Sequence, residues 1–465
     1  MSDTIHGKVV IAEAGGPDHP ATVVQLGGDR VTDLYNAPPG DHGPVYDVVL
    51  PGLIDAHSHA RSVQLAAHGI GAGPLERFLI EVRALTPLPP EDEALAAADA
   101  ALATGITSVQ VFHHDFGDAA AYAERARAIA EGCSEAGIRA FIALGLTDQD
   151  EYAPATKGLH RHMKGVLTPS RGVTPAGFPG LASQLLGEHG LVSIDGVGPV
   201  APQWCSDDAL QAIAAVHGAR RVHAHLLESA RQRLAHDPVA RLEQVGLLSP
   251  ASSFAHGIWL DDAQMRRLAR AGATIIHCPG SNRRLGAGIC PVRRLLSAGV
   301  SVALGLDSNG TTQEPDMFAE MRRALQMSIS AGSPLTTAEV LAMATTGGAR
   351  ALARPDLGTL RPGAAADVLA LNLPGAAAAA DPVGYVIEHA TRESVAATWV
   401  AGRRTARSSA AAGARARLAA ALETDTPARA ARLAEVRGAW EAVDGAWRAA
   451  EQDVRWPPGP DEQRR

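Results

Sequence analysis

The stretch that decides the fold is PGLIDAHSHA, from Pro51 to Ala60. It joins a short apolar run to two histidines, His57 and His59, that are separated by one residue. Side chains at positions i and i+2 of a strand point to the same face, so both imidazoles would lie on one side of a strand end. Two such imidazoles supply half of a tetrahedral metal site. The pair alone could also be two ordinary surface histidines, and the rest of the chain must decide between these interpretations.

Apolar strand-like runs alternate with Ala-rich helical patterns from Val48 onward. This order is typical of parallel βαβ units, and continuous apolar strands indicate a sheet that is buried on both faces. Eight candidate strands start near residues 50, 106, 138, 191, 221, 252, 273 and 301. Eight strands are what a closed (β/α)8 barrel needs, although a doubly wound sheet can use as many. Irregular residues 150–190, with the run GLHRHMKG, predict a long loop after the third strand, either a functional lid or a surface excursion.

The two ends of the chain have a different pattern. Short strand-like runs fill residues 1–50, and LGTLRPGAAADVLAL and ATWVAGRRT are strand-like again near the other end. These runs could join in one small β domain. The expected division is a β domain from 1–48 and 358–405, a barrel over 49–357 and a helical extension over 406–465. An apolar stripe in the extension predicts a helix packed on the body rather than a partner interface, through Leu433, Val436, Trp440, Val443 and Trp447.

Composition narrows the partners of the protein. A net charge of −8 over 465 residues argues against nucleic acid or an anionic membrane as partner. Four scattered cysteines without a CxxC pair do not indicate a disulfide framework. The start lacks a signal-peptide pattern, and no run of about 18 apolar residues predicts a membrane span. We therefore expect a cytoplasmic protein that acts on a small molecule.

Polar residues recur where the predicted strands end, which is where catalytic groups of parallel barrels lie. Beyond the first pair, they are His225 and Glu228 in HAHLLES, His256 in FAHGIWL, and Asp307 in LGLDSNG. Each alone is more often structural, but their conjunction predicts a site. Three histidines and one carboxylate suit a borderline ion such as Zn²⁺ with a bound water. Asp307 could then take the proton of the water, Glu228 could shuttle a proton, and His256 could contact an oxyanion.

With these motifs, the chain resembles the amidohydrolase superfamily over roughly residues 1–405. Three further stretches carry the resemblance, namely GPVAPQWCSDDAL (198–210), IIHCPGSNRRLGAGICPV (275–292) and the closing LGTLRPGAAADVLAL. Within it, the chain is similar to the mononuclear branch of cytosine, guanine, adenosylhomocysteine and methylthioadenosine deaminases and triazine hydrolases. No Lys follows Lys164, whereas binuclear relatives use a carboxylated Lys on the fourth strand.

The resemblance implies an α/β fold, a distorted (β/α)8 barrel with a β-sandwich from both termini. It implies one divalent ion, zinc with iron or manganese as alternatives, bound by His57, His59, His225 and Asp307. Glu228 and Asp307 would move protons, and His256 would contact the substrate. Relatives of this kind are often homodimers.

The sequence specifies the substrate contacts less closely than it specifies the metal ligands. Many deaminase relatives have a His after the proline that corresponds to Pro199, where this chain has Val200. Of His113 and His114, at most one can face the pocket, because neighbouring strand residues point to opposite faces. His223 is expected to be structural. The candidate substrate contacts are Gln149, Gln203, Trp204, His113 and His277.

The leading hypothesis is a metal-dependent hydrolase of a non-peptide C–N bond that deaminates a small nitrogen heterocycle. An amide or cyclic-amide hydrolase with the same machinery is the alternative, and the Val200 departure favours it. A scaffold that has lost catalysis would need lost ligands or proton carriers, and every one of these residues is present in the sequence.

Overall fold

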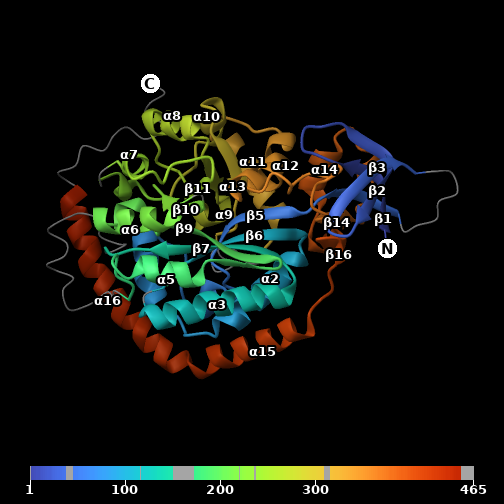
Figure 1. The fold of residues 1–465 in the computed structure, drawn as a ribbon. Helices are drawn as coiled ribbons and strands as arrows, with labels where there is room; N and C mark the ends of the chain where they lie inside the picture. The colour runs from blue at the N-terminus through green and yellow to red at the C-terminus, as the bar shows by residue number, and fades with distance from the viewer. Residues whose placement is uncertain are drawn as a thin grey trace.

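The computed structural model describes residues 2–37, 45–115, 117–149, 172–218, 220–234, 237–307 and 315–451. Its centre is a barrel-like sheet of eight parallel strands (Figure 1), ordered β13-β12-β11-β10-β9-β7-β6-β5. A bridge between Ser58 and Asp307 links its first and last strand segments. The strands are β5 (Leu53–Ser58), β6 (Ile106–His113), β7 (Arg139–Leu146), β9 (Val192–Pro199), β10 (Arg221–Leu226), β11 (Ser252–His256), β12 (Thr274–His277) and β13 (Ser301–Leu304). All eight predicted strands are confirmed.

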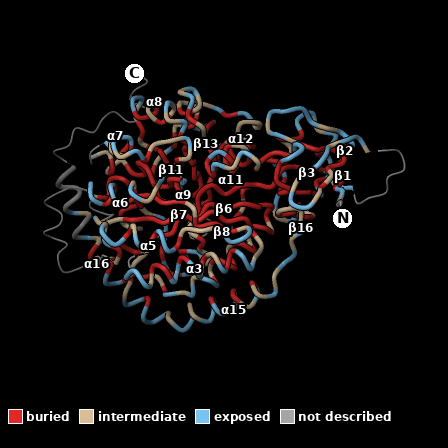
Figure 2. The backbone as a smooth tube through the Cα atoms, in the orientation of Figure 1, coloured by how far each residue is buried: buried red, intermediate tan, exposed pale blue. Residues whose placement is uncertain are grey.

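Helices lie around this sheet and bury its strands from outside. Every residue of β6 and of β7 is buried, and the strands form the buried centre of the tube in Figure 2. This burial explains the continuous apolar runs, because neither face of the sheet meets water. The helices are α1 (Leu75–Glu81), α2 (Pro90–Leu102), α3 (Ala119–Ala136), α5 (Phe178–Leu185), α6 (Asp207–His217), α7 (Pro238–Gln244), α8 (Asp262–Ala271), α9 (Pro279–Arg284), α10 (Val292–Ser297), α11 (Met317–Ser330), α12 (Thr337–Ala344), α13 (Thr346–Ala351) and α14 (Pro382–His389).

A second, mixed sheet combines strands from both ends of the chain, as predicted, and lies to one side of the barrel (Figure 1). Its order is β16-β15-β14-β4-β1-β2-β3. Residues from both ends share its apolar core, among them Ile5, Val24, Val368 and Trp399. The strands are β1 (Ser2–Ile11), β2 (Asp18–Gly27), β3 (Arg30–Asn36), β4 (Val45–Pro51), β14 (Val368–Leu371), β15 (Val395–Val400) and β16 (Arg403–Arg404).

A buried ion pair joins the two sheets. Arg139, at the start of β7, donates from Nε and Nη2 to the two carboxylate oxygens of Asp367, both at 2.9 Å. Asp367 also accepts a hydrogen bond from the backbone N–H of Ala401 at 2.8 Å. Only 10% of the Arg139 side chain and 4% of the Asp367 side chain are exposed. Removing one partner would therefore leave a charge that water cannot solvate.

We expect Asp367→Ala to lower the free energy of unfolding by about 3–5 kcal/mol, because it strands the Arg139 charge. The measurement is urea unfolding followed by circular dichroism. The exposed pair Lys8–Asp47, 2.7 Å long, provides the control, because Asp47→Ala should cost at most about 1 kcal/mol. Equal losses in the two variants would contradict this assignment.

The predicted loop over 150–190 is wrong in its second half. Residues 150–171, which include GLHRHMKG, lie outside the described residues. The following residues form α5 and the short strand β8 (Gly187–His189), which pairs antiparallel with β9. The buried side chains of α5 are spaced for one helix face, namely Phe178, Leu181, Ala182 and Leu185. The glycines and proline here suggested a loop, yet Pro179 lies in the first turn, where proline is compatible with a helix.

The C-terminal extension forms two helices, α15 (Ser409–Thr424) and α16 (Thr426–Glu451), which run along one edge of the barrel (Figure 1). Leu433 and Val436 of α16 are buried against Leu65, Ile70 and Ile80, and Trp440 packs beside them. The predicted packing of the stripe is thus confirmed for its first three residues. The side chains of Val443 and Trp447 lie outside the described residues.

Among the helices in the described part of the chain, none combines the length and apolar character that crossing a membrane requires.

Candidate metal centre

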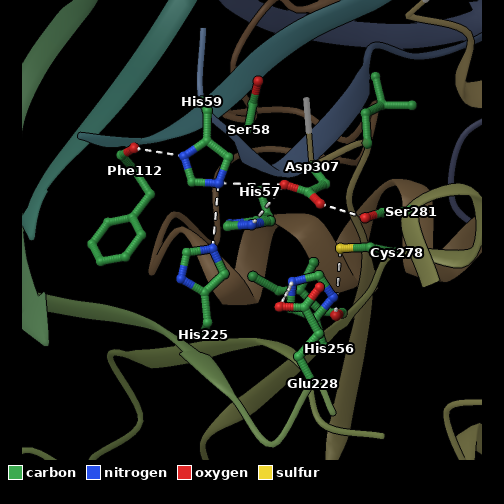
Figure 3. A network of polar contacts seen from close by, with 12 residues as sticks. His57, Ser58, His59, Phe112, His225, Glu228, His256, Cys278, Ser281 and Asp307 are labelled. Carbon is green, nitrogen blue, oxygen red and sulfur yellow. Dashed lines mark hydrogen bonds and ion pairs between the residues drawn. The ribbon is translucent and has the colours of Figure 1, made fainter. Parts of the chain in front are cut away.

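Three buried or partly buried histidines converge where β5 and β10 end (Figure 3). His59 Nδ1 lies 3.0 Å from the carbonyl oxygen of Phe112, and His225 Nδ1 lies 2.8 Å from that of Val200. A carbonyl oxygen only accepts, so in both rings Nδ1 carries the proton and Nε2 keeps its lone pair. His57 Nδ1 contacts another imidazole, that of His223, at 2.8 Å. All three rings thus have a partner at Nδ1, and in His59 and His225 that partner leaves Nε2 free to bind an ion.

The free ring nitrogens face one another and a carboxylate. His225 Nε2 lies 3.3 Å from His59 Nε2. Asp307 Oδ1 lies 3.3 Å from His59 Nε2 and 3.5 Å from His57 Nε2. The three histidine nitrogens lie within 4.8 Å of one another, and Asp307 forms a second such group with Glu228 and His256. Asp307 therefore links the two groups.

The backbone holds Asp307 in an uncommon conformation. Its φ of 66° lies in the left-handed region, and its N–H donates to the carbonyl oxygen of His57 at 2.8 Å. Ser281 Oγ donates to Oδ2 at 2.5 Å. Burial alone would raise the pKa of Asp307, but the neighbouring His57 and His59 imidazoles hold it well below its usual value. Asp307 is therefore a carboxylate at neutral pH.

Glu228 and His256 form the other side of the site. Glu228 Oε2 lies 3.6 Å from His256 Nε2. His256 Nδ1 lies 2.9 Å from the side-chain oxygen of Asn282 on α9, and a donated Nδ1 proton leaves Nε2 facing the site. Burial, with the nearby carboxylates of Asp307 and Glu76, raises the pKa of Glu228 well above its usual value. The buried site therefore favours the protonated form of Glu228 more than water does.

The donor set fits a divalent cation. His57 Nε2 is buried and has no hydrogen-bond partner among the described residues, which costs free energy unless another group binds it. Burial lowers the pKa of His57 to about 4 and that of His225 well below its usual value. Neutral imidazoles with fixed Nδ1 atoms and one carboxylate are a common ligand set for such an ion.

The candidate substrate contacts lie in different places. Gln203 and Trp204 are buried in the turn after β9, and their side-chain polar atoms have no hydrogen-bond partner among the described residues. His277 is buried at the end of β12, and its pKa falls to about 3 through burial and the neighbouring His256. Gln149 is exposed, and its backbone N–H donates to the carbonyl oxygen of Trp204.

His113 does not join the site, so its prediction as a substrate contact is wrong. Its Nε2 lies 3.2 Å from the carbonyl oxygen of Tyr122 on α3, against whose ring it packs. The next residue, His114, instead has its ring 5.5 Å from that of His59. The two neighbouring histidines face opposite ways, as expected. Which of them faces the site depends on the orientation of β6 in the barrel.

Several residues of the site were missed from the sequence. Ser281 and Asn282 lie in the CPGSN motif (278–282), and only His277, the residue before this motif, was singled out. Asp55, inside the opening stretch, accepts from the backbone N–H groups of Leu306 at 2.9 Å and His57 at 3.2 Å, so it ties β5 to the segment after β13. Its position two residues before His57, on the same strand face, was the available signal.

Comparisons with known proteins agree with this geometry. The sequence profile described as the Amidohydrolase family matches residues 48–405. The chain is 30% identical over 378 residues to the 5'-deoxyadenosine deaminase of Methanothermobacter thermautotrophicus, covering 78% of this chain and 83% of that protein. It is 31% identical over 405 residues to the 8-oxoguanine deaminase of Pseudomonas aeruginosa, covering 80% and 86%.

Two solved structures are similar in fold. One is the zinc complex of the atrazine chlorohydrolase of Arthrobacter aurescens, with a TM-score of 0.72 and 23% identity over 90% of this chain and 99% of that chain. The other is the guanine deaminase of E. coli, with a TM-score of 0.70 and 19% identity over 87% and 99%.

Proposed function

The chain belongs to the amidohydrolase family, and from this premise we propose that it is a metal-dependent hydrolase that deaminates a small nitrogen heterocycle. The observation that carries the proposal is the convergence of three imidazole Nε2 atoms and the Asp307 carboxylate opposite a buried Glu228. The deaminase relatives, which act on adenine and guanine derivatives by name, support an amino-substituted purine-like ring as substrate.

We assign the ion to His57, His59, His225 and Asp307, with zinc as the first candidate, because a similar fold has been solved with zinc; iron and manganese suit the same ligands. The bound ion would act as a Lewis acid that lowers the pKa of a water molecule toward neutrality.

The remaining steps belong to side chains of this protein. Asp307, a carboxylate with Oδ2 held by Ser281, accepts the proton of the attacking water at Oδ1. Glu228 donates its proton to a ring nitrogen as the sp² carbon becomes tetrahedral. His256 is held by Asn282, so its Nε2 can contact the oxygen that is added to that carbon. Asp307 then passes the proton that it took from the water to the amino group, which leaves as ammonia, while the added hydroxyl group returns a proton to Glu228.

A second candidate is hydrolysis of an amide or cyclic amide by the same groups. Val200 favours it: the side chain is buried in an apolar cluster with Ala201 and Trp204, beside the ligand His225. The position that often carries a polar substrate contact in deaminases is therefore apolar here. The two candidates differ in their products, because only deamination of the ring releases ammonia from an exocyclic amino group.

The test is ammonia release from zinc-loaded protein across amino-substituted purines, pyrimidines, pterins and triazines, with lactams, imides and ureides as a parallel panel for ring opening. We expect ammonia from at least one amino-substituted ring and none after chelation. Ring opening without ammonia release would replace the first candidate by the second. Failure on both panels by protein with bound zinc would contradict the proposal.

A further inference from the structure

A second histidine of β10, His223, lies directly behind the candidate metal ligands. Its Nε2 is 2.8 Å from Nδ1 of His57, and both side chains are completely buried. The other two histidine ligands direct Nδ1 at backbone carbonyl oxygens, as described above. His57 is thus the one histidine among the three whose Nδ1 partner is a side chain. A substitution can remove that partner without moving the main chain.

The amide of Gln110 limits the proton positions around His223. Its Oε1 accepts a hydrogen bond from Arg221, and a guanidinium group only donates, so Nε2 must point the other way. One Nε2 hydrogen goes to the carbonyl oxygen of Ala56 at 2.8 Å. The other can go to His223 Nδ1 at 2.9 Å or to Ser253 Oγ at 3.2 Å.

These two choices have opposite consequences for His57. If Gln110 donates to His223 Nδ1, the His223 proton is on Nε2 and is donated to His57 Nδ1, so the proton of a neutral His57 is on its Nε2. If Gln110 donates to Ser253 Oγ, His223 Nδ1 carries the proton and can donate it to the carbonyl oxygen of Ser253 at 3.1 Å. His223 Nε2 then accepts from His57 Nδ1. Only this second arrangement leaves a lone pair on His57 Nε2.

We infer that His223 is a positioning residue, which accepts the Nδ1 proton of His57 and so holds the His57 lone pair toward the metal. The inference rests on the proposed function, because it assumes the proposed ligand set. It assigns a role in metal affinity to a residue that sequence reasoning treated as structural. The partners of metal-bound histidines commonly fix the tautomer and ring orientation in this way.

The test compares zinc affinity, measured by competition with a chromophoric chelator, in three variants and the wild type. His223→Phe keeps a ring of similar size but removes the acceptor, and its affinity should fall by roughly 10–100-fold. In His223→Gln the side-chain oxygen can accept from His57 while the amide nitrogen donates to Ser253, so this variant should bind nearly as tightly as wild type. His113→Phe removes a buried imidazole of the same barrel that contacts α3, and its affinity should not change.

The outcomes separate the inference from the proposed function. Folded His223→Phe that binds zinc as tightly as wild type would overturn the inference and leave the proposed function intact. Wild-type protein that binds no zinc would overturn the proposed function, and the inference with it. If His223→Phe does not fold, ¹⁵N spectra of zinc-loaded wild type labelled at histidine give the answer. A proton on His223 Nδ1 supports the inference, and a proton on Nε2 overturns it.

Discussion

Asp307→Asn is expected to lose at least about 10³-fold in kcat, the upper part of the range for a general acid–base group, while the protein stays folded. The variant removes the negative charge at Oδ1, which faces the Nε2 atoms of His57 and His59. An amide NH₂ group in that place would donate toward the lone pairs that the metal needs. The variant therefore loses both a ligand and the proton acceptor for the attacking water.

Asparagine is the suitable replacement because of the backbone at this position. Among residues other than glycine, asparagine tolerates a φ of 66° well, so the turn after β13 should be preserved. The backbone N–H can still donate to the carbonyl oxygen of His57, and the side-chain oxygen can still accept from Ser281. An alanine variant would combine chemical loss with backbone strain.

The measurement is ammonia release with circular dichroism and zinc content on the same samples. Asp261→Asn is the matched control, because Asp261 caps α8 and asparagine caps helices as well as aspartate does. It should keep wild-type turnover. Folded Asp307→Asn that turns over at the wild-type rate would rule out the assigned role of Asp307.

Glu228→Gln should lower kcat by about 10²–10⁴-fold and leave zinc binding unchanged. Glutamine has nearly the same shape, but it cannot deliver the proton that the ring nitrogen requires. Burial raises the pKa of Glu228, and the carboxylates of Asp307 and Glu76 raise it further, which favours the protonated acid. As pH rises through this raised pKa, the proton is lost and the wild-type rate should fall.

The pH profile distinguishes proton donation from a structural role. The alkaline fall in kcat that belongs to Glu228 should be missing from the residual activity of Glu228→Gln. Glu243→Gln, at a side chain that is 51% exposed, should keep both the rate and the profile of wild type. An unchanged kcat in Glu228→Gln would exclude this group as the acid.

The barrel and the converging residues could be predicted because both follow from local patterns. Apolar runs mark strands, and the ends of parallel strands meet at one edge, so His57, His225, His256 and Asp307 could be grouped without coordinates. The residues that orient them could not be found in this way. Asn282 reaches His256, and Gln110 reaches His223, through side-chain directions that depend on packing between distant segments.

Other errors have equally specific causes. Gly177, Pro179 and Gly180 suggested a loop where the 3–4 spacing of Phe178, Leu181 and Leu185 makes a helix. His113 was preferred over His114 as a candidate because alternation gives two faces but not the one that faces inward. Gln149 is exposed whereas Gln203 is buried, so the proposed contact of Gln149 with substrate has less structural support.

The most direct test of metal-dependent deamination is a titration of zinc into metal-free protein, with ammonia release from the best substrate of the panel as the readout. The account predicts no release without metal, a linear rise with added zinc, and a plateau at about one equivalent per chain, as expected for one ion on the ligand set His57, His59, His225 and Asp307. Full ammonia release from the metal-free protein would contradict it.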